Sequence, residues 1–327
     1  MFAASKAAGV QNLAPKVLAL AQSGSPYIVA YSWGASGFRG TYSNPATPPA
    51  GNTKGVAFNP DSSVIAVGHA SGSNISAYPW TASGFGSKYT NPATLPTGNP
   101  TGVAFSPNGS FLAVSHEASP YVTVYPWSSS GFGTIYSNPA TLPTGDGQSV
   151  AFSPDNSAIA IAHTTTPFIT AYPWSGSGFG TKYANPATLP TGNSRGVAFS
   201  PDGSAIAVAS GLTPFILAYP WSGSGFGTKY ANPATLPGDG SDVAFSPNGL
   251  AIAVSGNNAP YVLAYPWSGS GFGTKYADPA TLPGGFGQGV AFSPDSSAIA
   301  IAHSSAPHIA AYPWSGSGFG SKYANPT

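Results

Sequence analysis

Histidine recurs at one position of a repeated segment in this chain of 327 residues. Neutral imidazole is a common zinc ligand, so a ring of histidines on one face could hold a metal ion or an anion. Three of the seven segments lack the histidine, and the positions would lie too far apart for one ion. We therefore interpret these histidines as residues at the start of a loop that hydrogen-bond the following turn, and we assign no metal site. Counting eleven residues back from each tryptophan gives Gln22, His69, His116, His163, Ser210, Gly256 and His303.

Carboxylates are few and fall where turns are expected. One turn position alternates between two residue types: Asp61, Asn108, Asp155, Asp202, Asn248 and Asp295. A carboxylate mechanism requires the acid itself, so this exchange indicates turn propensity. Glu117 is the one acid that we place outside turns and crossings. Beside His116 it could form an acid–base dyad, but we interpret the two as an exposed loop pair, and we predict no catalytic residue and no enzymatic activity.

Aromatic residues form the most suggestive set. Each segment has a Tyr-Pro-Trp phrase (Tyr-Ser-Trp in the first), a Phe five residues after the Trp and a Tyr nine residues after it. Two interpretations remain open: the rings fill the space between repeats, or they stack on sugar rings, where seven weak sites would bind by avidity. The candidate ligand-binding residues are Trp33, Trp80, Trp127, Trp174, Trp221, Trp267 and Trp314, with Tyr42, Tyr89, Tyr136, Tyr183, Tyr230, Tyr276 and Tyr323.

Lysine recurs eight residues after the Trp in five of the segments. On an exposed strand, lysine blocks edge-to-edge pairing with other chains. A basic rim that contacts an acidic partner is the alternative. The residues at this position are Thr41, Lys88, Ile135, Lys182, Lys229, Lys275 and Lys322.

The period of the repeat predicts the elements that position these residues. Consecutive tryptophans are separated by 47, 47, 47, 47, 46 and 47 residues. Within one repeat, short runs rich in Val, Ala, Ile, Phe and Tyr are separated by Pro-Asp-Gly and Ser-Gly turns, which is typical of four strands at 196–201, 205–209, 215–221 and 225–230. We predict an all-β fold, a seven-bladed β-propeller with four antiparallel strands per blade, in the order 1-2-3-4, and a repeat of about 47 residues.

One domain accounts for nearly the whole chain. We expect residues 1–16 to form an N-terminal arm or, at 9–14, a degenerate first strand of blade 1. Residues 17–327 form the propeller, which we expect to close by packing of blade 1 on blade 7. The predicted blades lie at approximately 8–45, 53–92, 100–139, 147–186, 194–233, 240–279 and 287–327.

Composition excludes several classes of function. Only 6% of residues are charged and the formal net charge is +1, so we expect no binding to nucleic acid. The absence of cysteine excludes disulfides, thiolate zinc sites and cysteine nucleophiles. Residues 1–16 lack the pattern of a signal peptide, and no stretch approaches the roughly 18 apolar residues that span a bilayer. We expect no membrane insertion and no cofactor.

The phrase Val-Ala-Phe-Ser-Pro-Asp resembles the innermost strand of WD-repeat and related propellers. It stands, with Asn in place of Ser or Asp at three points, at 56–61, 103–108, 150–155, 197–202, 243–248 and 290–295. The resemblance covers six blades and implies the propeller fold. Two features depart from it: Ser, Thr or Gly follows the third-strand Trp in place of Asp, and no Gly-His pair precedes the first strand. The buried His–Ser/Thr–Asp–Trp network of WD blades therefore cannot be built here.

The phrases Ser-Gly-Phe-Gly-Thr-Lys-Tyr and Asn-Pro-Ala-Thr-Leu-Pro are similar to those of repeat proteins encoded by tailed bacteriophages. This resemblance implies a structural or host-attachment protein of the virion, in tail or capsid, within a larger assembly. Its partners would be other virion proteins or host-surface glycans. Two alternatives remain: a free carbohydrate-binding propeller lectin, and an intracellular protein-interaction scaffold in the cytoplasm.

Overall fold

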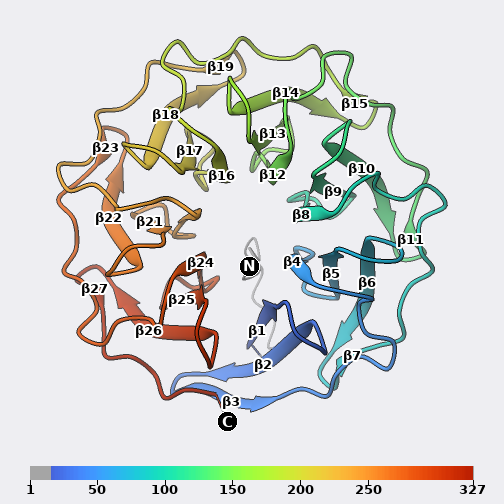
Figure 1. Cartoon of the computed structure of the whole chain (residues 1–327), viewed down its shortest axis with the longest axis horizontal. Helices are drawn as coiled ribbons and strands as arrows, with labels where there is room; N and C mark the ends of the chain where they lie inside the picture. Colours follow the sequence, from blue (N-terminus) through green and yellow to red (C-terminus); the bar gives the residue numbers. More distant parts are fainter. Residues whose placement is uncertain (1–15, 327) are drawn as a thin grey trace.

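The computed structural model describes residues 16–326, which form seven antiparallel sheets around a central axis (Figure 1). The predicted all-β, seven-bladed β-propeller is confirmed. The expected arm or first strand within residues 1–15 lies outside the described residues. In blades 2 to 7 the strands follow chain order from the axis outward, as predicted.

The strand bounds repeat closely from blade to blade. Blade 1 comprises, within the described residues, β1 (Lys16–Ala21), β2 (Ile28–Gly34) and β3 (Gly37–Thr41). The innermost strands of blades 2 to 7 are β4 (Thr53–Phe58), β8 (Pro100–Phe105), β12 (Gly147–Phe152), β16 (Ser194–Phe199), β20 (Asp242–Phe245) and β24 (Gly287–Phe292). The second strands are β5 (Val64–His69), β9 (Phe111–His116), β13 (Ala158–His163), β17 (Ala205–Ser210), β21 (Ala251–Ser255) and β25 (Ala298–His303).

The two outer strands of each blade are joined by a tight turn. The third strands of blades 2 to 7 are β6 (Ile75–Thr81), β10 (Val122–Ser128), β14 (Ile169–Ser175), β18 (Ile216–Ser222), β22 (Val262–Ser268) and β26 (Ile309–Ser315). The outermost strands are β7 (Gly84–Phe85), β11 (Gly131–Phe132), β15 (Gly178–Phe179), β19 (Gly225–Phe226), β23 (Gly271–Phe272) and β27 (Gly318–Phe319).

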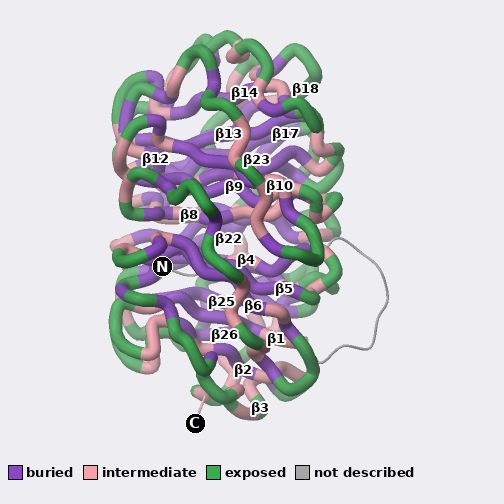
Figure 2. Tube along the Cα trace, turned by 90° about the vertical axis from the view of Figure 1, so that its right-hand side faces the viewer, coloured by how far each residue is buried: buried purple, intermediate pink, exposed green. Residues whose placement is uncertain are grey.

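Alternation of small and large residues lets the blades pack face to face. Side chains of a strand point alternately to its two faces, so Ala-Ile-Ala-Ile-Ala in β13 has alanines on one face and isoleucines on the other. The alanine face of blade 4 packs against the large side chains of blade 5, among them Ile206 and Trp221. Each interface therefore joins a small face to a large one. The buried residues lie mainly along the strands, and the exposed residues lie mainly in the connections (Figure 2).

The two faces of the disc carry different connections. Because the strands alternate in direction, the first hairpin turns and the turns between third and fourth strands lie on one side, which we call the turn face. The loops between second and third strands lie on the other side, where each crossing to the next blade also arrives. We call this side the crossing face.

The outermost strand is shorter than the sequence predicts. In blade 5 it covers Gly225 and Phe226, in place of the six residues expected. Pro220, in the Tyr-Pro-Trp phrase of β18, has no N–H and cannot extend the ladder. In blade 1 Ser32 replaces this proline, and β3 there extends over 5 residues.

Each crossing is held by the tyrosine of the Tyr-Pro-Trp phrase. Tyr219 is fully buried and donates a hydrogen bond from its hydroxyl to the carbonyl oxygen of Thr188 at 2.9 Å. The equivalent hydroxyl bonds the equivalent threonine carbonyl in five more blades, through Tyr78, Tyr125, Tyr172, Tyr265 and Tyr312. The tyrosine thus fixes the path of the chain between blades.

Replacing Tyr219 by Phe is expected to lower the free energy of unfolding by about 1–2 kcal/mol, because the Thr188 carbonyl loses its partner. Urea denaturation measures the change. Tyr230→Phe, at a half-buried ring of the same blade, is the matched control and should change stability by less than about 0.5 kcal/mol. Equal losses in both variants would contradict the proposed role of the crossing bond.

The ring closes between blades 1 and 7, as the sequence predicts. Leu18 and Leu20 of β1 and Tyr31 of β2 pack against Ala300 and Ile309 of blade 7. Figure 1 shows β1 to β3 beside β24 to β27, so the two ends of the described chain are neighbours.

Candidate functional site

The predicted aromatic residues meet in pairs across every interface between blades. The Tyr of one blade packs edge-to-face on the Trp of the next; Tyr230 and Trp267, for example, have ring centroids 5.2 Å apart at 82°. Tyr323 contacts Trp33 at 5.1 Å and 85°, so the same pair closes the ring. The five other pairs are Tyr42–Trp80, Tyr89–Trp127, Tyr136–Trp174, Tyr183–Trp221 and Tyr276–Trp314.

The tryptophans are packing residues in this structure. Six of them expose 4–8% of their surface, and Trp33 is half-buried. They make T-shaped contacts with Phe and Tyr neighbours, and their small exposed fractions leave a ligand no open Trp platform. The seven partner tyrosines are half-buried, and their ligand contacts stay a prediction.

A glycine without a side chain leaves room for each tyrosine ring in the interface between blades. Gly225 has a φ of +94°, and a Cβ there would lie 3.1 Å from the Tyr183 ring. Only glycine adopts this backbone conformation at little cost. The Gly-Phe pair that opens every outermost strand therefore follows from the Tyr–Trp contact.

A groove of about 340 Å³ opens on the turn face between blades 2 and 3. It combines an aromatic pair with short polar side chains. Asp61 is exposed, and its Oδ1 accepts hydrogen bonds from the Ser63 amide at 2.9 Å and the Ser63 hydroxyl at 2.6 Å. Burial alone would raise the pKa of Asp61, but the bonds from Ser63 outweigh it and lower that pKa, so the group is ionised at neutral pH. The lining includes Asp61, Ser63, Tyr89, Asn108, Gly109, Trp127, Ser128 and Ser129.

The recurring histidines are buried and do not converge on an ion. His69 donates from Nδ1 to the Ser71 carbonyl oxygen at 2.8 Å, so its Nε2 accepts from the Ser76 hydroxyl at 2.9 Å. The predicted bond to the following loop is thus present at His69, whereas Nδ1 of His116, His163 and His303 is buried without a hydrogen-bond partner among the described residues. His116 and His163 place Nε2 at 3.0 and 2.9 Å from threonine hydroxyls on the third strand.

Burial keeps these histidines neutral. Desolvation lowers the pKa of His69, His116 and His163 from 6.5 to about 4 and also lowers that of His303. Among the described residues, no three His, Cys, Asp or Glu side chains are grouped so that they could hold a metal ion.

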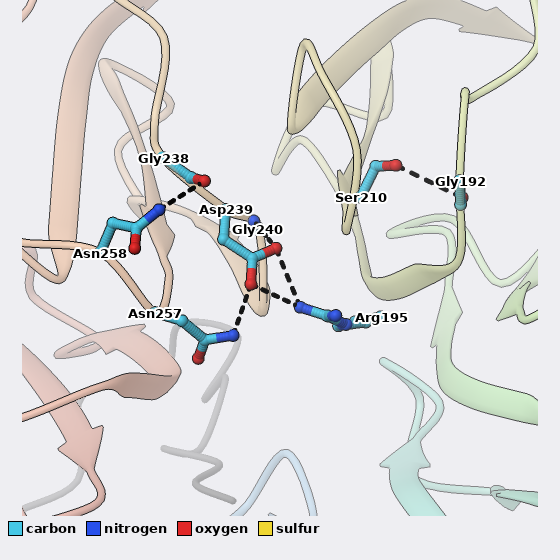
Figure 3. A network of polar contacts seen from close by, with 8 residues as sticks. All are labelled: Gly192, Arg195, Ser210, Gly238, Asp239, Gly240, Asn257 and Asn258. Carbon is cyan, nitrogen blue, oxygen red and sulfur yellow. Dashed lines mark hydrogen bonds and ion pairs between the residues drawn. The ribbon is translucent and has the colours of Figure 1, made fainter.

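The central channel is lined by the innermost strands and contains a cavity of about 680 Å³. Arg195 stands at its crossing-face mouth, where Nη1 lies 2.9 Å from both carboxylate oxygens of Asp239 (Figure 3). Asn257 also donates to Asp239. The carboxylate is therefore fully engaged by its neighbours, which suits a structural clamp between blades 5 and 6.

A second clamp joins blades 2 and 3 at the equivalent positions. Lys54 pairs with Glu117 at 2.5 Å, and Asn99 donates to the other carboxylate oxygen at 3.1 Å. Burial alone would raise the pKa of Glu117, but Lys54 and Asn99 hold it below its usual value. Glu117 faces Lys54 while His116 bonds Thr123, so the two do not form the acid–base dyad considered from the sequence.

One expectation about the acidic residues needs correction. Glu117 is not the only acid outside turns and crossings, because Asp242 lies in β20 and lines the channel. Its carboxylate accepts from the Val290 amide at 3.1 Å. The sequence analysis missed it because a one-residue deletion in this repeat obscures where the strand begins.

Recurring lysines contact the side chain three residues later in the sequence. Lys88 and Lys229 place Nζ 2.6 Å from Asn91 and Asn232. Lys275 makes the same contact with Asp278. These contacts give the lysines a local structural role at the blade edge, where we expected lysine to block pairing.

The fold and its seven Tyr–Trp contacts define the class: the chain is a seven-bladed β-propeller. Structures similar to it include two proteins provisionally named 6-phosphogluconolactonase. The one from Bacteroides fragilis is 13% identical, with a TM-score of 0.74 over 94% of this chain and 93% of that one. The one from Bacteroides uniformis is 15% identical, with a TM-score of 0.71 over 89% of each.

Hydrazine synthase from Kuenenia stuttgartiensis is also similar, at 12% identity and a TM-score of 0.66 over 88% of this chain and 89% of that one. At these identities the likeness concerns the fold alone. No family model matches the sequence, and the search of curated proteins found no match. Within residues 16–326, no helix is long and apolar enough to cross a membrane.

Proposed function

We propose that this propeller is a non-enzymatic, polyvalent binding protein that holds neutral glycans in the grooves between its blades. The observation that carries the proposal is the groove between blades 2 and 3. Its aromatic pair, Tyr89 and Trp127, stands beside the Asp61 carboxylate and the Ser128 and Ser129 residues. Sugars have apolar C–H faces and many hydroxyls, so they suit a wall of this mixed character.

Repetition supports the same conclusion. A shallow groove binds one sugar weakly, but several grooves on one rigid face bind a polymeric glycan by avidity. The surface has few charges to attract an ionic ligand, with only 6% charged residues in the whole chain. On the turn face, exposed aspartates of the first hairpin turns stand among Ser, Asn and Gly residues.

The opposite face supports attachment to another protein. Five of the six exposed large apolar side chains among the described residues lie in crossings or in loops of the crossing face: Leu95, Leu212, Leu236, Leu282 and Phe286. We propose that the crossing face docks on a larger assembly while the turn face meets glycans.

A virion is the assembly that the sequence phrases suggest, as a tail or capsid protein in host attachment. The comparisons give this setting no support, and it stays a prediction. A free lectin and an intracellular scaffold are the alternatives. A lactonase activity, as the names of two structural neighbours suggest for those proteins, is not proposed, because the acids at the channel mouth are engaged as clamps.

A glycan array tests the proposal directly. The full chain, applied at high density, is expected to bind at least one neutral glycan, and soluble monosaccharide should displace it only at millimolar concentration. Such a high concentration is expected because the array glycan engages several sites at once, and this avidity can exceed the affinity of a single site by about 10²–10⁴. Absence of binding to every glycan at high valency would overturn the proposal.

A further inference from the structure

The interfaces between neighbouring blades differ on the turn face at one pair of positions, which in the interface of blades 2 and 3 lines the groove. One member precedes the Trp of its blade by 19 residues, and the other precedes the Trp of the next blade by 18 residues. In the five pairs that join blades 2 to 7, an Asp at the first position accompanies Gly at the second, and an Asn at the first accompanies a residue with a side chain. The five pairs are Asp61–Gly109, Asn108–Asn156, Asp155–Gly203, Asp202–Gly249 and Asn248–Ser296.

The side chain in two of these pairs spans the groove. Asn156 accepts a hydrogen bond at Oδ1 from the Asn108 amide at 3.0 Å, which joins blades 3 and 4. Ser296 accepts at Oγ from the Asn248 amide at 3.1 Å, which joins blades 6 and 7. A polar atom of the protein therefore occupies the place where a ligand atom would have to enter.

The three glycines leave that place empty. A Cβ at Gly109 would meet only Pro60, at 3.5 Å, and one at Gly203 only Pro154, at 3.8 Å. A Cβ at Gly249 would meet nothing within 4 Å. Across each of these positions stands an exposed aspartate, whose carboxylate can accept hydrogen bonds from a ligand hydroxyl.

We infer that the chain has three saccharide sites, in the grooves between blades 2 and 3, 4 and 5, and 5 and 6, and that the residue opposite the aspartate decides which grooves bind. This inference rests on the proposed function and adds two statements to it: the number of sugar sites per chain, and the residue that decides whether a site is open, which we call the gate. The ligand of each site is one neutral sugar ring, with a hydroxyl on the aspartate and its apolar face toward the half-buried Tyr of the Tyr–Trp pair. The two interfaces that flank blade 1 are not assigned.

The seven tryptophans report on the grooves one by one, since each lies at a different interface. The full chain is labelled with 5-fluorotryptophan, its ¹⁹F resonances are assigned by single Trp→Phe variants, and methyl glycosides of glucose, galactose, mannose and N-acetylglucosamine are titrated separately. For at least one sugar, we expect Trp127, Trp221 and Trp267 to shift in a saturable way. Trp174 and Trp314, in the bridged grooves, should stay unchanged.

Two variants are expected to close one site and to open another, using only residues that the chain already has at the equivalent positions. Gly109→Asn copies Asn156, whose φ of 60° is close to the 71° of Gly109, and should abolish the shift of Trp127 while those of Trp221 and Trp267 remain. The double variant Asn248→Asp, Ser296→Gly places an Asp–Gly pair between blades 6 and 7. The ¹⁹F resonance of Trp314 should then shift on addition of the sugar. An unchanged melting temperature shows that both variants are folded.

The outcomes separate the gate from the function. Equal shifts at all interfaces, or a Trp127 shift that survives Gly109→Asn, would overturn the gate while leaving glycan binding intact. Array binding without a shift at any Trp would place the ligand elsewhere and overturn the inference. No binding on the array and no shift would reject both.

Discussion

Lowering the pH from about 7.5 to about 5 is expected to reduce the free energy of unfolding by about 6 kcal/mol, mainly through three buried histidines. His69, His116 and His163 have their pKa lowered to about 4 by desolvation, against 6.5 for the exposed group. Between these values the unfolded chain binds protons that the folded chain does not. The stability is therefore complete above pH 6.5, falls as the pH falls, and levels off below about pH 4.

The chain supplies its own control for this prediction. Ser210 occupies the histidine position in blade 5. His163→Ser therefore gives blade 4 a side chain that the fold accommodates at the equivalent position. Urea denaturation across this pH range should show that the variant loses about 2 kcal/mol less than the wild type, one third of the effect. Carboxylates titrate mostly below this range and do not obscure it. An unchanged pH dependence in the variant would contradict the role assigned to the buried imidazoles.

Replacing Tyr323 by Ala is expected to open the ring at its one junction that no crossing spans. The substitution removes the edge-to-face contact with Trp33 and should cost about 2–3 kcal/mol, less than the roughly 3–5 kcal/mol for a fully buried aromatic, because the ring is half-buried. Because only non-covalent contacts join blades 1 and 7, the loss should appear as local opening. Amide exchange in β1 to β3 should then speed up by about 30-fold or more.

Tyr230→Ala is the matched control for the closing contact. It removes the same type of contact, with Trp267, at an interface that a crossing also spans. We expect a similar loss of global stability but no selective change in the exchange of β1 to β3. If both variants accelerated exchange in β1 to β3 equally, the closing contact would have no special role.

The repeat made the fold predictable in detail. A constant spacing of Trp, turn residues at constant offsets and alternating apolar runs all indicate one blade, and seven copies leave little freedom for another arrangement. The short outermost strand was not expected, although Pro220 carries the reason in the sequence: a residue without an N–H cannot extend a ladder. Burial of the histidines could not be read from spacing, because it depends on how the loops fold over the strand ends.

The candidate site was only partly predictable for the same physical reason. The sequence identifies which Trp and Tyr residues recur, but the Tyr contacts the Trp of the next blade, some 38 residues further on, as Tyr230–Trp267 and Tyr89–Trp127 show. The Asp–Gly, Asn–Asn and Asn–Ser pairs likewise become recognisable only when neighbouring blades are placed side by side in space. Contacts between repeats, unlike those within one, leave no short-range pattern.

The central claim is that the inter-blade grooves of the turn face bind neutral glycans. The most direct test compares wild type with the triple variant Gly109→Asn, Gly203→Asn and Gly249→Asn on the same glycan array. The three substitutions fill every groove to which a sugar is assigned, with a residue that the fold already accepts at Asn156. We predict that wild type binds and that the folded triple variant does not. Equal binding by the two proteins, or none by the wild type, would contradict the account.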